Sequence, residues 1–86
     1  MERSEIIRVI QQSAHEIAER EFAPFKEHQV IAALGLDSLS TLEMVGMIER
    51  ELAIHLPTDE LTEIHSVGQL TDLIERKLRG AKPRSG

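Results

Sequence analysis

Ser38 is the residue of this chain whose type and setting best suit covalent chemistry. It stands in the run Gly35-Leu36-Asp37-Ser38-Leu39, where a turn signal is followed directly by the start of an amphipathic helix. Gly35 tolerates the backbone angles of a tight turn, and Asp37 is a favoured N-cap because its carboxylate accepts free N–H groups of the first turn. Ser38 is then the first helical residue, beside exposed N–H groups and the positive end of the helix dipole, which favour a phosphate group.

Two other roles for Ser38 compete with phosphate attachment. Ser and Asp are also favoured at helix starts for capping alone, so a plain structural role is open. A hydrolytic nucleophile is disfavoured, because glycines do not flank Ser38 as in a nucleophile elbow and no strand is predicted before it. The chain has four histidines that could join such a site on paper, His15, His28, His55 and His65. Their spacing, without any Cys, does not match a zinc site, so neither an enzyme nor a metal centre is expected.

The length and composition indicate one small helical domain. With 86 residues, of which 41% are hydrophobic, the chain can bury one thin core. It has no Cys, so any thiol chemistry would have to come from a cofactor. Aromatic residues are 2% of the chain, which argues against stacking on nucleic acid. No apolar run approaches the roughly 18 residues of a membrane span, and no signal-peptide pattern is present, so a cytoplasmic monomer is expected.

The charge of the chain, −5 in total, is unevenly spread. Residues 37–65 carry seven acids and one base, whereas residues 76–86 carry five bases and no acid. The acidic part surrounds Ser38, where it would repel nucleic acid and attract a partner with a basic patch. The basic end follows the last predicted helix, so we expect a folded domain over residues 1–80 and a flexible basic tail over 81–86.

The first part of the chain predicts one long helix and a long connection. Apolar residues recur at helical spacing from residue 6 onward. Ser4 can cap this helix, which is expected to end near residues 20–22, before Pro24. Residues 22–36 then form a long connection, with a short helical turn expected around 30–34. Apolar residues are spread along the connection, so it is expected to pack onto the bundle.

Three further helices are predicted in the rest of the chain. The second helix is expected over residues 38–52, a short third over 59–64, and a fourth over 66–80 that opens with a capping box between Ser66 and Gln69. The stripe expected to be buried on the second helix consists of Leu42, Val45, Ile48 and Leu52. The fold class is therefore all-α, a small irregular up-and-down helical bundle.

The run Asp37-Ser38-Leu39, with Leu34-Gly35 before it and residues 42–45 (Leu-Glu-Met-Val) after it, resembles the prosthetic-group site of acyl carrier proteins and peptidyl carrier domains. The predicted order of elements is also similar to that family, so the resemblance covers about residues 6–78. It implies an acyl-carrier-like four-helix bundle with a long first loop and a short third helix. It further implies that 4′-phosphopantetheine, taken from coenzyme A, is esterified to Ser38, and that Asp37 assists transfer of this arm.

The resemblance implies a non-catalytic carrier of acyl groups held as thioesters on the arm. Its partners would be a phosphopantetheinyl transferase and acyl-loading, condensing and tailoring enzymes with basic patches. The residues expected to face these partners are Leu39, Glu43, Met44, Met47, Glu49 and Glu51. Leu56 and Ile64 are candidates for an acyl pocket. Ordinary core packing is the alternative for the two pocket candidates and for both methionines.

Three positions depart from the usual pattern of bacterial fatty-acid carriers. Ser40 stands where an acid is common, Gly46 where an exposed apolar residue is common, and Arg50 interrupts a run of acids. These changes keep the arm site intact but put the standard fatty-acid partners in doubt, so a carrier in specialised polyketide-type biosynthesis is favoured over one in fatty-acid biosynthesis. A free-standing peptidyl carrier of a nonribosomal pathway, or a carrier-like interaction module without the arm, stands as the alternative.

Overall fold

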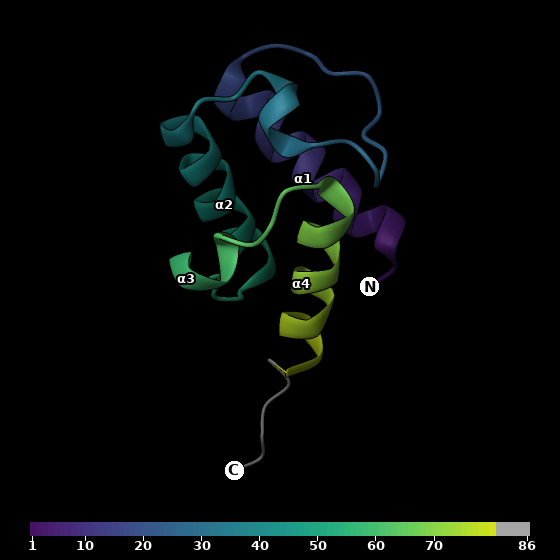
Figure 1. The fold of residues 1–86 in the computed structure, drawn as a ribbon. Coiled ribbons are helices and arrows are strands. Elements are labelled where there is room, and N and C mark those ends of the chain that lie inside the picture. The colour runs from purple at the N-terminus through teal and green to yellow at the C-terminus, as the bar shows by residue number, and fades with distance from the viewer. Residues whose placement is uncertain (81–86) are drawn as a thin grey trace.

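The computed structural model describes residues 1–80 and contains four α-helices and one short 3₁₀-helix in that part of the chain. In chain order these are α1 (Arg3–Ala18), η1 (Ile31–Leu34), α2 (Ser38–Leu52), α3 (Thr58–Leu61) and α4 (Val67–Gly80), as Figure 1 shows. The all-α prediction is confirmed. The basic tail predicted over residues 81–86 lies outside the described residues.

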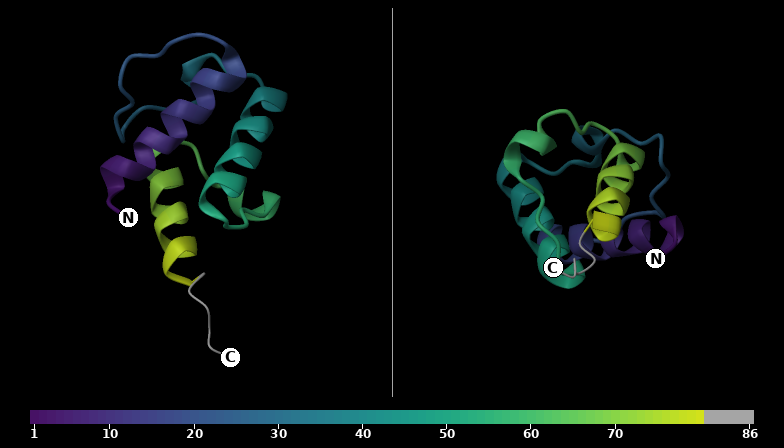
Figure 2. Two further views of the ribbon diagram at one scale, coloured as in Figure 1. Left: turned by 180° about the vertical axis from the view of Figure 1, so that it is seen from behind. Right: turned by 90° about the horizontal axis from the view of Figure 1, so that it is seen from below.

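Helix α1 is the element that holds the bundle together. It packs against both α2 and α4, which lie on the same side of it (Figures 1 and 2). Apolar side chains of all three helices close the core together with three residues from the connections. The buried core consists of Ile6, Ile10, Ala14, Phe25, Ile31, Met44, Val45, Ile48, Leu56, Val67, Leu70, Leu73 and Ile74.

The ends of α1 differ from the sequence prediction. The N-cap is Glu2 rather than Ser4, because the Glu2 and Glu5 side chains form a capping box that satisfies two backbone N–H groups. The helix stops at Ala18, earlier than the predicted 20–22, because Glu19 adopts a left-handed backbone conformation with φ of 57° and donates its N–H to the His15 carbonyl oxygen.

Backbone hydrogen bonds fasten the second half of the long connection to the start of α4. The Gly68 N–H donates to the Glu27 carbonyl oxygen at 2.8 Å, and the Ile31 N–H donates to the His65 carbonyl oxygen at the same distance. Gly68 is needed for this approach, since a Cβ there would lie 3.0 Å from the Glu27 carbonyl oxygen. The predicted packing of the connection onto the bundle is confirmed, because Phe25 and Ile31 are buried.

An ion-pair cluster around Arg3 joins the same connection to α1 and α4. The Arg3 guanidinium contacts Glu27 at 2.6 Å, Asp72 at 2.6 Å and Glu75 at 2.7 Å. The hydrogen bond that Arg3 donates lowers the pKa of the Glu27 carboxyl. The hydrogen bonds that Arg3 donates to Glu27 and then to Asp72 raise the pKa of Arg3 above its ordinary value. The cluster therefore holds three segments together as long as the acids are ionised.

Helix α2 buries Val45 and Ile48 as the sequence predicts, but one position of the predicted buried stripe is wrong. Met44, expected at the partner surface, is fully buried, whereas Leu42, expected in the core, is 54% exposed. These residues lie two positions apart and so point to nearly opposite sides of a helix with 3.6 residues per turn. Because α1 packs on the side that carries Ile48 and Val45, Met44 is enclosed and Leu42 is left outside.

Candidate functional site

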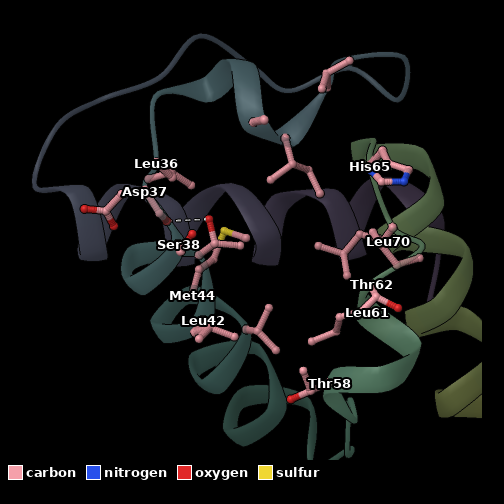
Figure 3. Close-up of a pocket in the computed structure, with 16 residues that line it drawn as sticks. Leu36, Asp37, Ser38, Leu42, Met44, Thr58, Leu61, Thr62, His65 and Leu70 are labelled. Atoms are coloured by element: carbon pink, nitrogen blue, oxygen red, sulfur yellow. Dashed lines mark hydrogen bonds between the residues drawn. The ribbon is translucent and has the colours of Figure 1, made fainter.

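Ser38 lies at the first position of α2, as the sequence predicts, and both Ser38 and Asp37 are exposed. The Asp37 carboxylate caps the helix by accepting the Ser40 N–H at 2.7 Å. The Thr41 hydroxyl donates to the Asp37 carbonyl oxygen at 2.9 Å, the interaction dashed in Figure 3. Hydrogen bonds from the Ser40 backbone and then its side chain hold the pKa of the Asp37 carboxyl below its ordinary value. The serine hydroxyl is thus presented at a capped, ordered helix tip.

The turn that leads into this helix tip is held by Arg20. Gly35 ends η1 with φ of 87°, a left-handed conformation that favours glycine. The Arg20 guanidinium donates to the Leu34 carbonyl oxygen at 2.6 Å, directly before that glycine. Sequence reasoning missed Arg20. Its position just past the first helix, two residues before Phe22, is only a weak sequence signal, because the contact between the two side chains forms in the folded loop.

A mostly apolar cavity of about 420 Å³ lies beside Ser38, between α2, α3 and η1. In the close-up of Figure 3, side chains of α2 such as Leu42 line one side of the cavity. Thr58 and Leu61 of α3, with Thr62 directly after it, line the other side. Ile64, an acyl-pocket candidate, lines this cavity. The sequence did not indicate that the threonines or Leu61 would take part, because α3 is too short for a readable period.

Leu56, the other acyl-pocket candidate, does not line the cavity beside Ser38. It is 3% exposed and belongs to the core. It borders a separate hollow that also contains Gly46 and Pro57, further along the groove between α2 and α3. The burial of Leu56 favours core packing, which was the alternative for this residue, and its pocket role stays a prediction.

The residues predicted to face partners divide into two groups. Leu39 is 66% exposed, and Glu43 and Glu51 are also exposed, so these three are accessible. Met47 is only half-buried. Met44 is wrong as a partner residue, since its side chain is inside the core.

Glu49 is largely engaged within the molecule. Its carboxylate accepts the Leu56 N–H at 2.6 Å and lies 3.3 Å from the His55 Nδ1. These contacts give the half-buried Glu49 a structural role, because they hold the α2–α3 connection against α2. The sequence did not indicate this role, because Leu56 lies seven residues after Glu49, beyond the three- or four-residue spacing of contacts within a helix.

Comparison with known proteins agrees with this geometry. Residues 6–74 match the family described as phosphopantetheine attachment site. The chain belongs to this family. The match covers α1 from residue 6 onward, the long connection and all of α2, including Ser38 at its start. 4′-Phosphopantetheine is accordingly the cofactor of this phosphopantetheine-attachment chain.

Several acyl carrier proteins are similar to it in sequence. Anthracycline acyl carrier protein DauA from Streptomyces sp. (strain C5) is 44% identical over 48 residues, which are 56% of this chain and 57% of the relative. The acyl carrier protein of Porphyromonas gingivalis is 41% identical over 46 residues, 54% of this chain and 59% of the relative. The oxytetracycline polyketide synthase acyl carrier protein of Streptomyces rimosus is 29% identical over 83 residues, 96% and 87% of the two chains. The first two alignments thus span little more than half of those relatives.

A solved structure supports the fold in detail. The acyl carrier protein from Thermotoga maritima superposes with a TM-score of 0.86 at 27% identity, covering 95% of this chain and 96% of that chain. The predicted acyl-carrier-like bundle, with its long first loop and short third helix, is confirmed. None of the helices in residues 1–80 is both long enough and apolar enough to cross a membrane.

The residues around Ser38 fit a covalently bound phosphopantetheine. A phosphodiester needs an accessible hydroxyl, and Ser38 is exposed. Its negative charge would lie at the N-terminus of a 15-residue helix, where backbone N–H groups and the helix dipole stabilise an anion. The apolar cavity begins at Ser38 itself, so space for an attached chain lies next to the attachment point.

Proposed function

We propose that this chain is a discrete acyl carrier protein that bears 4′-phosphopantetheine on the Ser38 hydroxyl and works in specialised polyketide-type biosynthesis. The observation that carries the proposal is the exposed Ser38 at the capped N-terminus of α2, beside an apolar cavity. When bound, the arm supplies a terminal thiol on which an acyl group is carried as a thioester. The chain itself catalyses no reaction and is the substrate of the enzymes that load and unload it.

The attachment step would join Ser38 to the phosphopantetheine half of coenzyme A. The serine oxygen attacks the phosphorus that bears the pantetheine, the pyrophosphate bond breaks, and adenosine 3′,5′-bisphosphate leaves. The proton of the serine hydroxyl passes to a base of the transferase. Within this chain, Asp37 keeps the first turn of α2 ordered through Ser40 and holds a negative charge next to the attacking oxygen, where a transferase-bound metal ion would meet it.

The pathway assignment rests on two observations. Relatives of this chain include carriers named for anthracycline and oxytetracycline synthesis. The outer side of α2 also departs from fatty-acid carriers at Ser40, Gly46 and Arg50. Basic patches of the phosphopantetheinyl transferase and of acyl-loading, condensing and tailoring enzymes would meet Glu43 and Glu51, with Leu39 supplying an apolar contact.

The test is the intact mass of the purified chain after incubation with coenzyme A, magnesium and a broad-specificity phosphopantetheinyl transferase. We expect one phosphopantetheine adduct on the wild type and none on Ser38→Ala. Ser40→Ala is the matched control, since it removes a second hydroxyl of the same turn and should be modified like the wild type. No adduct on the folded wild type with several transferases would contradict the proposal and favour an unmodified interaction module.

The cargo is tested on the modified chain. Loading by an acyltransferase with malonyl-coenzyme A, set against loading by adenylation enzymes with amino acids, separates an acyl carrier from a peptidyl carrier. We expect the malonyl adduct in the intact mass. Aminoacyl adducts alone would favour the alternative, a peptidyl carrier of a nonribosomal peptide pathway.

A further inference from the structure

The C-terminal end of α1, η1 and the N-terminal end of α2 lie together at one end of the molecule (Figures 1 and 2). Arg20 reaches across this end, from two residues past α1 to the last residue of η1. Its guanidinium donates to the Leu34 carbonyl oxygen at 2.6 Å. A cationic side chain on the last carbonyl of a short helix stabilises that helix end.

Arg20 is itself fixed at both of its ends. The His15 Nδ1 lies 2.7 Å from the Arg20 carbonyl oxygen, and donates to it when that nitrogen carries the proton. The guanidinium lies over the Phe22 ring at 4.3 Å from its centroid. Phe22 in turn makes an edge contact with the buried Phe25, with ring centroids 5.4 Å apart. Arg20 is an exposed residue, and stacking on Phe22 holds its guanidinium against the surface of the bundle.

The Arg20 guanidinium also lies close to the backbone of Gly35. A Cβ added to Gly35 would lie 2.5 Å from an Arg20 guanidinium nitrogen, so the glycine backbone and the guanidinium are in close contact. Only Leu36 and Asp37 separate this contact from Ser38. The backbone on either side of Ser38 is therefore hydrogen-bonded, at the Ser40 N–H to Asp37 and at the Leu34 carbonyl oxygen to Arg20.

We propose that Arg20 is a positioning residue for Ser38, which fixes the Leu34–Gly35 turn so that the serine hydroxyl is presented in one orientation to the transferase. This inference rests on the proposed attachment of the arm at Ser38. Arg20 touches neither the serine nor the arm and acts through the Leu34 carbonyl group. Its loss would allow the turn to sample other orientations, which lowers the fraction of encounters with a correctly placed nucleophile.

The chain offers a matched control for this proposal. Arg3 is the second arginine that anchors the long connection, but it does so in the middle of the connection, through Glu27. The variants Arg20→Met and Arg3→Met each remove one guanidinium anchor and keep an apolar stem of similar length. A general loosening of the connection would affect arm transfer in both variants, whereas positioning of Ser38 would affect it only in Arg20→Met.

The first measurement is the kinetics of arm transfer with coenzyme A at varied concentrations of carrier. We expect Arg20→Met to lower kcat by roughly three- to tenfold with little change in KM, as loss of one exposed charge-assisted hydrogen bond implies. Arg3→Met should keep the wild-type kcat. Arg20→Lys should recover part of the loss, because an ammonium group can reach the Leu34 carbonyl oxygen but lacks the planar stacking of a guanidinium.

The second measurement is amide hydrogen exchange on the unmodified chain, which needs no transferase. Exchange of residues 36–40 should become faster in Arg20→Met, while Arg3→Met should affect residues 27–31 instead. If the wild type accepts no arm, the proposed function fails, and the exchange data still decide whether Arg20 orders the turn. A wild-type kcat in Arg20→Met, a rise in KM alone, or unchanged exchange at residues 36–40 would each overturn the proposal.

Discussion

The two sides of α2 are built for opposite purposes. The inner side carries Met44 and Ile48, both fully buried against the rest of the core. The outer side carries Leu39 and Leu42, which are more than half exposed, and Gly46, whose added Cβ would meet no atom within 4 Å. The inner side is closed by contacts within the molecule, while the outer side leaves apolar surface and open space without a use in the isolated chain.

This difference indicates that the buried side of α2 serves stability and the exposed side serves recognition. A domain of this size has a thin core, so each buried side chain of α2 counts. Two exposed leucines do not contribute to that core, and a mid-helix glycine weakens the helix. Both features are explained when the outer side of α2 meets partner enzymes next to Ser38, as the proposed carrier function requires.

The largest effect on stability is expected from truncating a buried side chain on the inner side of α2. Ile48→Ala should lower the free energy of unfolding by about 2–5 kcal/mol, because a fully buried side chain leaves a cavity when it is truncated. Urea denaturation followed by circular dichroism measures this loss. A loss below about 1 kcal/mol would mean that α2 is not held through this side.

The helix tip, which belongs to neither side, is tested through Asp37. Asp37→Ala removes the cap on the Ser40 N–H and should lower Tm by a few degrees, as loss of an N-cap does in small domains. Because folding lowers the Asp37 pKa, its contribution is present above the ordinary value of 3.8 and is lost as the pH falls through the folded-state value. The Tm gap between wild type and variant should therefore be constant at neutral pH and close in acid. A gap that stays the same across the whole acid titration of the protein would contradict this account.

A substitution at Gly46, on the outer side of α2, is expected to raise stability rather than lower it. Gly46→Ala should raise the free energy of unfolding by up to about 1 kcal/mol, since alanine has the higher helix propensity and its Cβ meets no atom within 4 Å. Gly68→Ala is the matched control, because there the added Cβ would meet the Glu27 carbonyl oxygen at 3.0 Å and should destabilise the fold. Both are read by chemical denaturation. No gain in stability for Gly46→Ala would contradict the open space at that position, and a gain for Gly68→Ala would contradict the close approach to the Glu27 carbonyl oxygen.

The order and fold of the elements were predictable because they rest on local signals. Asp37 caps α2 at the predicted residue, and Ser66 and Gln69 form the predicted capping box of α4, with hydrogen bonds of 3.1 Å in both directions. Such signals act over three or four residues, within the reach of sequence reasoning. They also located Ser38, whose neighbours in the chain define the site.

What was not predictable depends on contacts between distant segments. Leu42 and Met44 are both apolar on an amphipathic helix, and only the position of α1 decides which of them is enclosed. Glu49 is acidic and on α2, yet it is engaged by the Leu56 N–H in the next connection. Arg20 is 14 residues from the carbonyl group that it holds. In each case the sequence gives the residue type, and tertiary packing decides its role.

The smallest effect on stability, and the sharpest test of the outer side, is expected for Leu42→Ala. Leu42 is 54% exposed, so its truncation should change the free energy of unfolding by no more than about 0.5 kcal/mol. Leu73→Ala, the same change at a residue that is 2% exposed, should cost about 2–5 kcal/mol. Chemical denaturation of this matched pair measures the contrast between surface and core.

The same variant separates recognition from stability. Leu42 lines the cavity beside Ser38 and lies on the exposed side of α2, so its truncation should weaken acyl loading of the modified chain while the fold stays intact. Loading rates of Leu42→Ala, compared with wild type at equal concentration of modified carrier, give the effect. Loading of the variant at the wild-type rate would show that Leu42 has no role in acyl loading. Recognition would then depend on Leu39 and the acidic residues of α2.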